Sequence, residues 1–308
     1  MFRVATVEPD ERKDVLALMF DGLTQDVCES RTAEVLQAQR DGSLSLEGLL
    51  KVEGDAAAIK AAGFYTVQLD GTAYLWPPFL SDDDEQYEAG DVLLQEMCRK
   101  IDDAGALLAQ CLVEPDHVRQ QRALSRNGFE HLADLSFLQR SLERPLAALP
   151  DSPLETVVFD PEQNRRRFAE LLEQTYVETL DCPKFHDLRS GDDALRSHQT
   201  AGQFDPRRWK IFRADGQDVG ALLLSDHPEQ DAWEVVYVGI APEFRGRHYG
   251  HDMLLQGLHE ARAAGRSSVF LAVDRQNSPA TRIYRQLQFE EVGVRAVHVR
   301  GTPKSAPN

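Results

Sequence analysis

The sequence contains few cysteines and no long apolar run. Its 308 residues include four cysteines, Cys28, Cys98, Cys111 and Cys182, and no CxxC pair. Cysteines so few and so scattered exclude a disulfide scaffold and argue against structural zinc, so we expect no metal. No stretch approaches the roughly 18 apolar residues of a membrane span. The first residues also lack the basic and apolar regions of a secretory signal. We therefore expect a cytoplasmic protein that does not bind membranes.

Basic residues are scarce relative to acidic ones. The chain holds 34 Lys and Arg against 51 Asp and Glu, a formal net charge of −17. Such a balance argues against general affinity for nucleic acid or anionic lipid. The imbalance is concentrated in residues 1–150, which carry 14 basic and 27 acidic residues, whereas residues 151–308 carry 20 and 24. A polyanionic ligand would therefore meet much less repulsion on the second half.

A pattern of elements occurs twice, about 160 residues apart. The helical run DVLLQEM from Asp91 matches DMLLQGL from Asp252, and each run is followed by an Ala-Gly pair and an apolar, strand-like segment. A short amphipathic helix, a Phe-Glu pair and an alternating segment then follow in both copies. Self-similarity in this order indicates a duplicated α/β unit. We predict one domain over 1–145, a second over 151–301 and a disordered tail over 302–308.

Strands and helices alternate in the second copy, which predicts a mixed α+β fold. The predicted strands cover residues 155–159, 209–213, 219–225, 233–240, 268–273 and 292–299. The predicted helices cover residues 161–180 and 251–264, with a short helix that starts at Pro279 and has Ser278 as its N-cap.

The segment 235–258 carries the clearest chemical signal. An apolar strand runs into an Ala-Pro pair, then into a basic turn that contains glycine, and then into a helix. Backbone N–H groups at such a turn and at a helix N-terminus can bind an anion. Gly246 and Gly250 allow phosphate oxygens to approach the backbone, and Arg245 and Arg247 add positive charge. The segment therefore predicts a site for a pyrophosphate or a similar group.

Residues 240–250, IAPEFRGRHYG, resemble the acyl-CoA pyrophosphate loop of the GNAT N-acetyltransferase superfamily. The family pattern is Gln/Arg-x-x-Gly-x-Gly/Ala after a strand that ends in proline. Arg245 matches its first position and Gly250 its last, whereas His248 replaces the middle glycine. A histidine can still adopt the required turn and contact phosphate, although its Cβ adds bulk.

A second resemblance lies downstream, in residues 277–289. NSPATRIYRQLQF is similar to the second cofactor motif of the same family, in which an Asn precedes a short helix that carries a Tyr and ends in Gly-Phe. Asn277 and Tyr284 match this motif, whereas Gln288 stands where glycine is usual. The two motifs and the strand pattern together cover roughly residues 155–300.

The resemblance implies a tandem GNAT-like protein whose domains each have a mostly antiparallel central sheet flanked by helices. It further implies acetyl-CoA as the acyl donor, bound along a splayed strand and at the loop. The implied contacts are Val238, Gly239, Ile240, Arg245, Gly246, Arg247, His248, Tyr249, Gly250, His251, Asn277 and Tyr284.

The implied reaction is direct acyl transfer to an amine, which needs a base for the amine and an acid for the leaving thiolate. Strand parity puts Glu234 on one face with Val236, Val238 and Ile240, and partial burial there would suit a general base. The resemblance makes Tyr284 the general acid. The structural alternatives are a solvent-facing Glu234, a core Tyr284 and, for Asn277, a simple turn residue.

The first copy lacks the features of the second. Its counterpart of the phosphate loop, residues 79–90, carries five acidic side chains: Asp82, Asp83, Asp84, Glu85 and Glu88. These charges would repel a pyrophosphate, although a solvated acidic loop without a ligand is the simpler alternative. Leu124 aligns with Tyr284 and His117 with Asn277. We therefore expect a degenerate domain without CoA chemistry.

The sequence defines the acceptor site less well than the donor site. Asp181, Cys182 and His186 follow the first helix of the second copy, where the family builds its acceptor site, so we predict that they line the acceptor pocket. The acidic first half favours a cationic amine. The identity of the amine, the acyl chain length and the oligomeric state stay open. The alternative function is a catalytically silent acyl-CoA-binding or regulatory protein.

Overall fold

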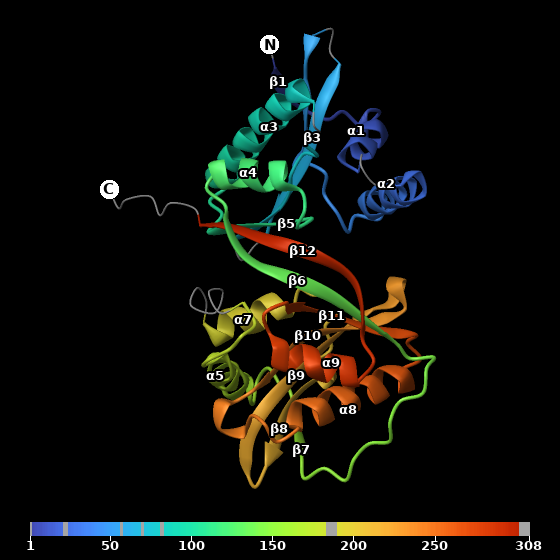
Figure 1. Ribbon diagram of the computed structural model, residues 1–308, viewed down its shortest axis with the longest axis vertical. Helices are drawn as coiled ribbons and strands as arrows, with labels where there is room; N and C mark the ends of the chain where they lie inside the picture. The colour runs from blue at the N-terminus through green and yellow to red at the C-terminus, as the bar shows by residue number, and fades with distance from the viewer. Residues whose placement is uncertain are drawn as a thin grey trace, which may run out of the picture. The chain divides into compact units, whose positions relative to one another are not determined.

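The structure of the protein, a computed structural model, describes residues 2–20, 24–55, 58–68, 71–80, 83–182 and 190–301. The chain forms two compact units (Figure 1). The first comprises Met1–Leu132 and Ala296–Asn308, and the second comprises Ala133–Arg295.

The first unit is a mixed sheet with helices on both faces. Its strands are β1 (Arg3–Thr6), β2 (Leu49–Glu53), β3 (Ile59–Val67), β4 (Thr72–Trp76), β5 (Leu108–Val113) and the end of β12 (Glu290–Gly301). They pair in that order, antiparallel except for β4 and β5, which are parallel. Its helices are α1 (Arg12–Met19), α2 (Gln25–Arg40), α3 (Asp84–Asp103) and α4 (Val118–Arg126).

The second unit repeats this succession. Its strands are β7 (Glu155–Val158), β8 (Trp209–Ala214), β9 (Gln217–His227), β10 (Ala232–Ile240), β11 (Ser268–Asp274) and most of β6 (Glu130–Ser141). They pair in that order, and only β10 and β11 are parallel. Its helices are α5 (Arg165–Tyr176), α7 (Gly191–His198), α8 (Tyr249–Ala263) and α9 (Ser278–Gln286).

The last strand of each sequence copy belongs to the other unit. β6 closes the first copy yet pairs with β11, and β12 closes the second copy yet pairs with β5. Both strands alternate in the same way, so the sequence pattern does not distinguish the two pairings. The two sequence copies therefore do not coincide with the two compact units, because each copy contributes its last strand to the other unit. The predicted domains 1–145 and 151–301 follow the sequence copies and remain a prediction.

Each sheet is covered by helices of matching position. In the first unit, α3 and α4 pack on one face and α1 and α2 on the other, as Figure 1 shows around β3. In the second unit, α8 and α9 pack on one face of the sheet, with Met253, Leu258 and Leu287 buried. The other face packs against α5 and α7, through Phe168, Leu172 and others. The predicted α+β fold is confirmed.

Several predicted boundaries shift in the structure. The helix expected over 161–180 is shorter, because α5 spans Arg165–Tyr176 and Pro161 lies in the turn before it. Helix α8 starts two residues before the predicted 251. The predicted N-cap Ser278 is wrong: Asn277 is the N-cap, and its side chain accepts a hydrogen bond from the N–H of Ala280. Among the described helices, none is long and apolar enough to cross a membrane.

Candidate active site

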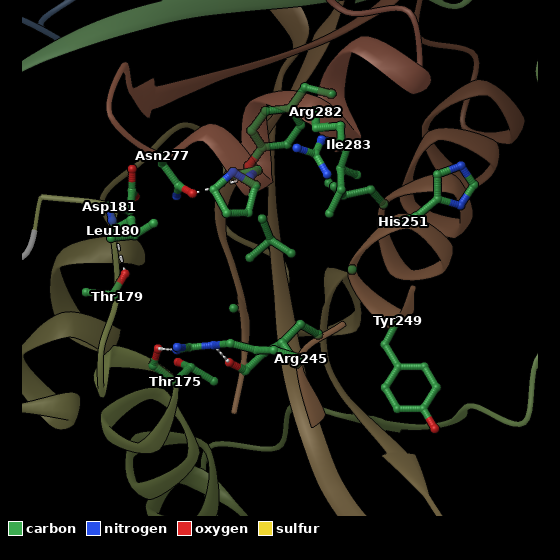
Figure 2. Close-up of a pocket in the computed structure, with 18 of the residues that line it drawn as sticks. Thr175, Thr179, Leu180, Asp181, Arg245, Tyr249, His251, Asn277, Arg282 and Ile283 are labelled. Atoms are coloured by element: carbon green, nitrogen blue, oxygen red, sulfur yellow. Dashed lines mark hydrogen bonds between the residues drawn. The ribbon is translucent and has the colours of Figure 1, made fainter. Parts of the chain in front are cut away.

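A cavity of about 500 Å³ lies in the second unit. Its walls are the second half of β10, the loop that leads into α8, the start of α8, the helix α9 and the segment that follows α5. Figure 2 shows Asp181 and Asn277 at one end of the cavity, and Tyr249 and His251 at the other. The cavity is therefore framed by the same elements that carry the two sequence motifs.

Two parallel strands separate at this cavity. β10 pairs with β11 only over its first residues, Ala232–Glu234 opposite Ser268–Phe270, whereas it continues to Ile240. On its other edge β10 stays paired with β9 up to Ile240. The residues of β10 beyond Glu234 line the cavity from one side, and Leu271 and Ala272 of β11 line it from the other. This wedge can admit an extended chain whose amides pair with the edge of β10.

The two residues that replace family glycines adopt the backbone conformation that glycine favours. His248 is the N-cap of α8 with φ of 65°, and Gln288 has φ of 62°. A left-handed backbone is strained for residues with a side chain, although histidine tolerates it better than most. Both turns therefore keep the shape of the motif despite the departures in sequence.

Replacing either residue by glycine is expected to stabilise the protein. His248→Gly and Gln288→Gly relieve the left-handed strain, and we expect each to raise the free energy of unfolding by about 0.5–1 kcal/mol. Denaturant unfolding measures this change in the free energy of unfolding. Ala264→Gly is the control. Because Ala264 already has a right-handed backbone (φ −77°), glycine there should lower the free energy of unfolding. Equal losses in all three variants would contradict the argument.

Arg245 fastens the phosphate loop to α5. Its guanidinium donates hydrogen bonds to the carbonyls of Thr175 (3.0 Å), Val177 (2.7 Å) and Glu178 (3.2 Å), and its Nε donates to Ile240 (3.1 Å). Figure 2 shows this side chain reaching Thr175. Four of the five N–H groups of Arg245 have carbonyl acceptors, so its first role is to hold the loop against the end of α5.

The other basic side chains near the loop differ in whether they line the cavity. Arg247 is exposed, contacts the Phe244 ring and the Glu243 carbonyl, and does not belong to the cavity lining. Arg282 of α9 and His251 of α8 both line the cavity. The N-terminus of α8 adds further N–H groups at this end, with Gly250 among the lining residues. These groups give the end beside α8 the character of an anion site.

Tyr284 is buried beside the cavity. Only 5% of the residue is exposed, and its ring packs edge-on against Phe289 at 5.6 Å. Burial, and then the nearby Asp181 carboxylate, raises the pKa of the Tyr284 hydroxyl. Among the described residues no hydrogen bond to this hydroxyl is found. The phenol is therefore a protonated donor that a bound ligand can accept from.

Asp181 and Asn277 meet at the start of α9. Asn277 caps the helix through its carbonyl oxygen and also hydrogen-bonds to the Asp181 carboxylate. Asp181 Oδ1 accepts from the N–H of Asp274 at 2.9 Å. Burial raises the pKa of the Asp181 carboxyl, and the nearby Asp274 charge raises it further. Asp181 thus puts a carboxylate at one end of the cavity.

Cys182 lies beside the cavity rather than in its lining. Its N–H donates to Asp274 Oδ2 at 3.3 Å, and its backbone has a φ of 44°. Burial raises the pKa of its thiol to about 12, so the thiolate is not formed near neutral pH. His186, the third residue predicted for the acceptor pocket, lies outside the described residues.

Glu234 stands at the point where β10 and β11 separate. It is the last residue of β10 that pairs with β11, and its Oε2 lies 2.8 Å from Nε2 of His227. Glu234 is not part of the cavity lining, whereas its neighbours Val235 and Val236 are. The structure thus places this carboxylate next to the narrow end of the wedge.

The predicted strand parity of Glu234 is wrong. The β9–β10 register shifts between Val235 and Tyr237, so that Val236 and Tyr237 both pack toward α5 and α7. Val238 and Ile240 pack toward α8 and α9 instead. A β-bulge reverses the alternation beyond it, so Glu234 does not share a face with those two residues.

The cavity gathers most of the predicted site residues. Those in the lining are Asp181, Val238, Gly239, Ile240, Arg245, Gly246, His248, Tyr249, Gly250, His251, Asn277 and Tyr284. Glu234, Arg247 and Cys182 are outside it. The roles of all these residues stay predictions.

Among the lining residues that the sequence did not predict are Thr175, Glu178 and Arg282. Arg282 could have been found, because it stands two residues before Tyr284 on the short helix of the second motif. Thr175 and Glu178 carry no such signal. Their carbonyls accept hydrogen bonds from Arg245, which lies about 70 residues later in the sequence, so only tertiary packing brings them to the cavity.

In the first unit, the position that corresponds to the cavity is filled by side chains. With the offset of 160 residues, Pro77 and Pro78 stand where β10 has Tyr237 and Val238, and β4 ends at Trp76. Proline lacks the N–H that a pantetheine carbonyl would need. Leu80 fills the space above Gly90, the counterpart of Gly250: a Cβ on Gly90 would lie 2.2 Å from Leu80 Cδ2.

The same unit also lacks the polar groups of the second. Leu124, the counterpart of Tyr284, is fully buried, and Gln120 donates to the Pro78 carbonyl at 3.1 Å. The acidic loop forms ion pairs, Glu85 with Lys60 and Asp84 with Arg119. Asp82 lies outside the described residues. These contacts favour the prediction of a degenerate first domain.

Comparison with known proteins finds similarity to acetyltransferases. Residues 168–289 match the acetyltransferase (GNAT) family model. A mycothiol acetyltransferase from Thermomonospora curvata is 30% identical over 166 residues, 53% of this chain and 54% of that protein. The chain thus spans about half the length of that relative. A mycothiol acetyltransferase from Thermobispora bispora is 27% identical over 91% of this chain and 93% of its own.

Solved structures show the same fold. A GCN5-related N-acetyltransferase from Sphaerobacter thermophilus superimposes with a TM-score of 0.69 at 18% identity, over 100% of this chain and 98% of that one. A tandem GNAT protein from the clavulanic acid biosynthesis pathway covers 99% of both chains, with a TM-score of 0.53 at 13% identity. The tandem arrangement predicted from the duplication is thereby confirmed.

Proposed function

The second half of this chain belongs to the GNAT acetyltransferase family, and from this premise we propose that the protein transfers an acetyl group from acetyl-CoA to a primary amine. The observation that carries the proposal is the wedge between β10 and β11, which opens beside the N-terminus of α8. A thioester with a long amide-bearing arm and a pyrophosphate fits these two features together.

The donor binds with its pantetheine arm along Val238–Ile240 and its pyrophosphate at the loop before α8. Backbone N–H groups from Gly246 to Gly250 bind the phosphate oxygens, and the helix dipole adds to the attraction. Arg282 and His251 supply positive charge nearby. The thioester then lies toward the narrow end of the wedge, between Glu234 and Tyr284.

The amine attacks the thioester carbonyl carbon, forming the C–N bond, and the C–S bond then breaks. Glu234 accepts the proton that the amine nitrogen loses, and Tyr284 donates a proton to the leaving thiolate. The raised pKa of Tyr284 keeps that proton available near neutral pH. Asp181 and Glu178 place carboxylates at the acceptor end, which favours a cationic amine.

The alternative, a silent acyl-CoA-binding protein, was motivated by His248 and Gln288. Both residues adopt the left-handed backbone of the glycines they replace, so neither argues for a lost site. The names of the relatives make a mycothiol-type amine the first acceptor to screen, followed by polyamines, aminoglycosides, amino-acid derivatives and peptides with a free amine.

Calorimetric titration with acetyl-CoA tests the donor site, and we expect one site per chain. Gly250→Asp should abolish it: a carboxylate near a helix N-terminus favours the helix but repels the pyrophosphate. A Cβ at Gly250 meets only Ile283 (3.4 Å) and Ile240 (3.8 Å), so the fold should tolerate the change. Gly301→Asp, in open space, is the control.

Two outcomes would overturn parts of this proposal. Two sites per chain would show that the first unit also binds the donor. No heat and no thermal shift would remove the acyltransferase proposal, since a ligand at 100 times its Kd should stabilise the fold by about 2.7 kcal/mol.

A further inference from the structure

Glu234 has a partner whose function the proposed reaction leaves unassigned. Nε2 of His227 lies 2.8 Å from Oε2 of Glu234, on the neighbouring antiparallel strand β9. His227 pairs in register with Ala232, so the two side chains are diagonal neighbours on one face of the sheet, where long side chains meet. An ionised carboxylate can only accept, so Nε2 donates.

The imidazole is held from its other side. The ring of Phe270 on β11 packs against His227 at 5.0 Å with an interplanar angle of 62°. Phe270 is also the residue of β11 that pairs with Glu234. The three side chains therefore form a row across β9, β10 and β11, at the place where β10 and β11 separate.

The charged residue next to His227 on β9 has hydrogen-bond partners of its own. Asp226, the next residue along β9, is buried and binds Arg266 (2.7 Å) and Arg208 (3.2 Å). Arg208 in turn stacks on the Trp233 ring at 5.0 Å. Asp226 thus has two arginine partners, and it also interacts electrostatically with His227. The side chains of Glu234 and His227 are partly exposed, 26% and 20%.

We propose that His227 is a positioning residue for Glu234, an inference that rests on the proposed function. The Nε2–H of His227 fixes Oε2, which leaves Oε1 of Glu234 free to take the proton of the attacking amine. As the C–N bond forms and the C–S bond breaks, that proton ends on Oε1 and then leaves to solvent, to which Glu234 is partly open.

Three variants test the proposal, assayed with acetyl-CoA and the amine of highest turnover in the screen above. His227→Phe keeps the packing on Phe270 but loses the N–H, so kcat/KM should fall about tenfold, with the KM of acetyl-CoA unchanged. His227→Gln keeps an N–H donor, so it should restore most of that loss. His259→Gln, on the exposed part of α8, is the control.

A spectroscopic measurement needs no acceptor. In protein labelled with ¹⁵N-histidine, the signals lost in His227→Gln identify His227, and its Nε2 should carry the proton. Glu234→Gln should shift those signals. An imidazole of His227 protonated only at Nδ1 would overturn the proposal.

The outcomes separate this inference from the proposed function. If Glu234→Gln lowers turnover at least tenfold while His227→Phe matches the wild type, only the role of His227 is lost. If Glu234→Gln retains full turnover, the base of the proposed reaction is lost. A loss of turnover in His227→Gln as large as in His227→Phe would also reject the role of His227.

Discussion

Tyr284→Phe is expected to lower kcat by about 10²-fold while the Kd of acetyl-CoA stays within a factor of two. The hydroxyl lies at the cavity, 5% of the residue is exposed, and no described residue hydrogen-bonds to it. Phenylalanine keeps the ring packing against Phe289 and removes only the proton donor. Stopped-flow and titration measurements separate the two quantities.

The control for this variant is Tyr65→Phe, which removes a half-buried hydroxyl from the first unit. It should leave kcat and Kd unchanged. If Tyr284→Phe lowers affinity and leaves kcat intact, the hydroxyl binds the donor and does not act as an acid.

The stability and turnover of the protein at alkaline pH also depend on Tyr284. Its pKa is raised in the folded state, so its contribution to stability is present below the unfolded value of about 10 and is lost as the pH rises above it. Ionisation of Tyr284 should therefore not limit turnover below about pH 10. An alkaline limb near pH 8 that disappears in Tyr284→Phe would contradict this.

Arg245→Ala is expected to lower the free energy of unfolding by about 2–3 kcal/mol and to weaken acetyl-CoA binding at least tenfold. The variant leaves four carbonyl groups without their donor, three of them in the segment that ends α5. The loop before α8 then loses its attachment, so the N–H groups that bind phosphate are no longer held in place. Denaturant unfolding and calorimetry measure the two effects.

Arg247→Ala is the matched control, two residues away. Its side chain makes one 3.3 Å hydrogen bond to the Glu243 carbonyl and stacks on Phe244, so stability should change by less than about 0.5 kcal/mol. If Arg245 bound phosphate directly, Arg245→Ala would weaken binding with stability intact. That result would reject the fastening role.

Much of the fold could be predicted from local patterns. The repeat of DVLLQEM at Asp91 and DMLLQGL at Asp252 identified the duplication. Leu93, Leu94 and Met97 of the first helix are buried, and so are their counterparts Leu254, Leu255 and Leu258. The phosphate loop was also predictable, since glycine, arginine and a helix start are local features. Even His248 keeps the required turn, because a backbone conformation depends on a few neighbouring residues.

Contacts between distant segments were decided only by the tertiary structure. Arg245 looked like a phosphate ligand in sequence, whereas three of its hydrogen bonds go to carbonyls about 70 residues earlier. The bulge in β10 reversed the face of Val238 relative to Glu234, because one extra residue shifts every later side chain by half a period. The exchange of β6 and β12 likewise followed from pairing between two strands of similar pattern. The sequence by itself determined the type and order of the elements, because these depend on short-range periodicity. The tertiary structure decided their partners, because register and hydrogen bonding depend on residues that are far apart in the chain.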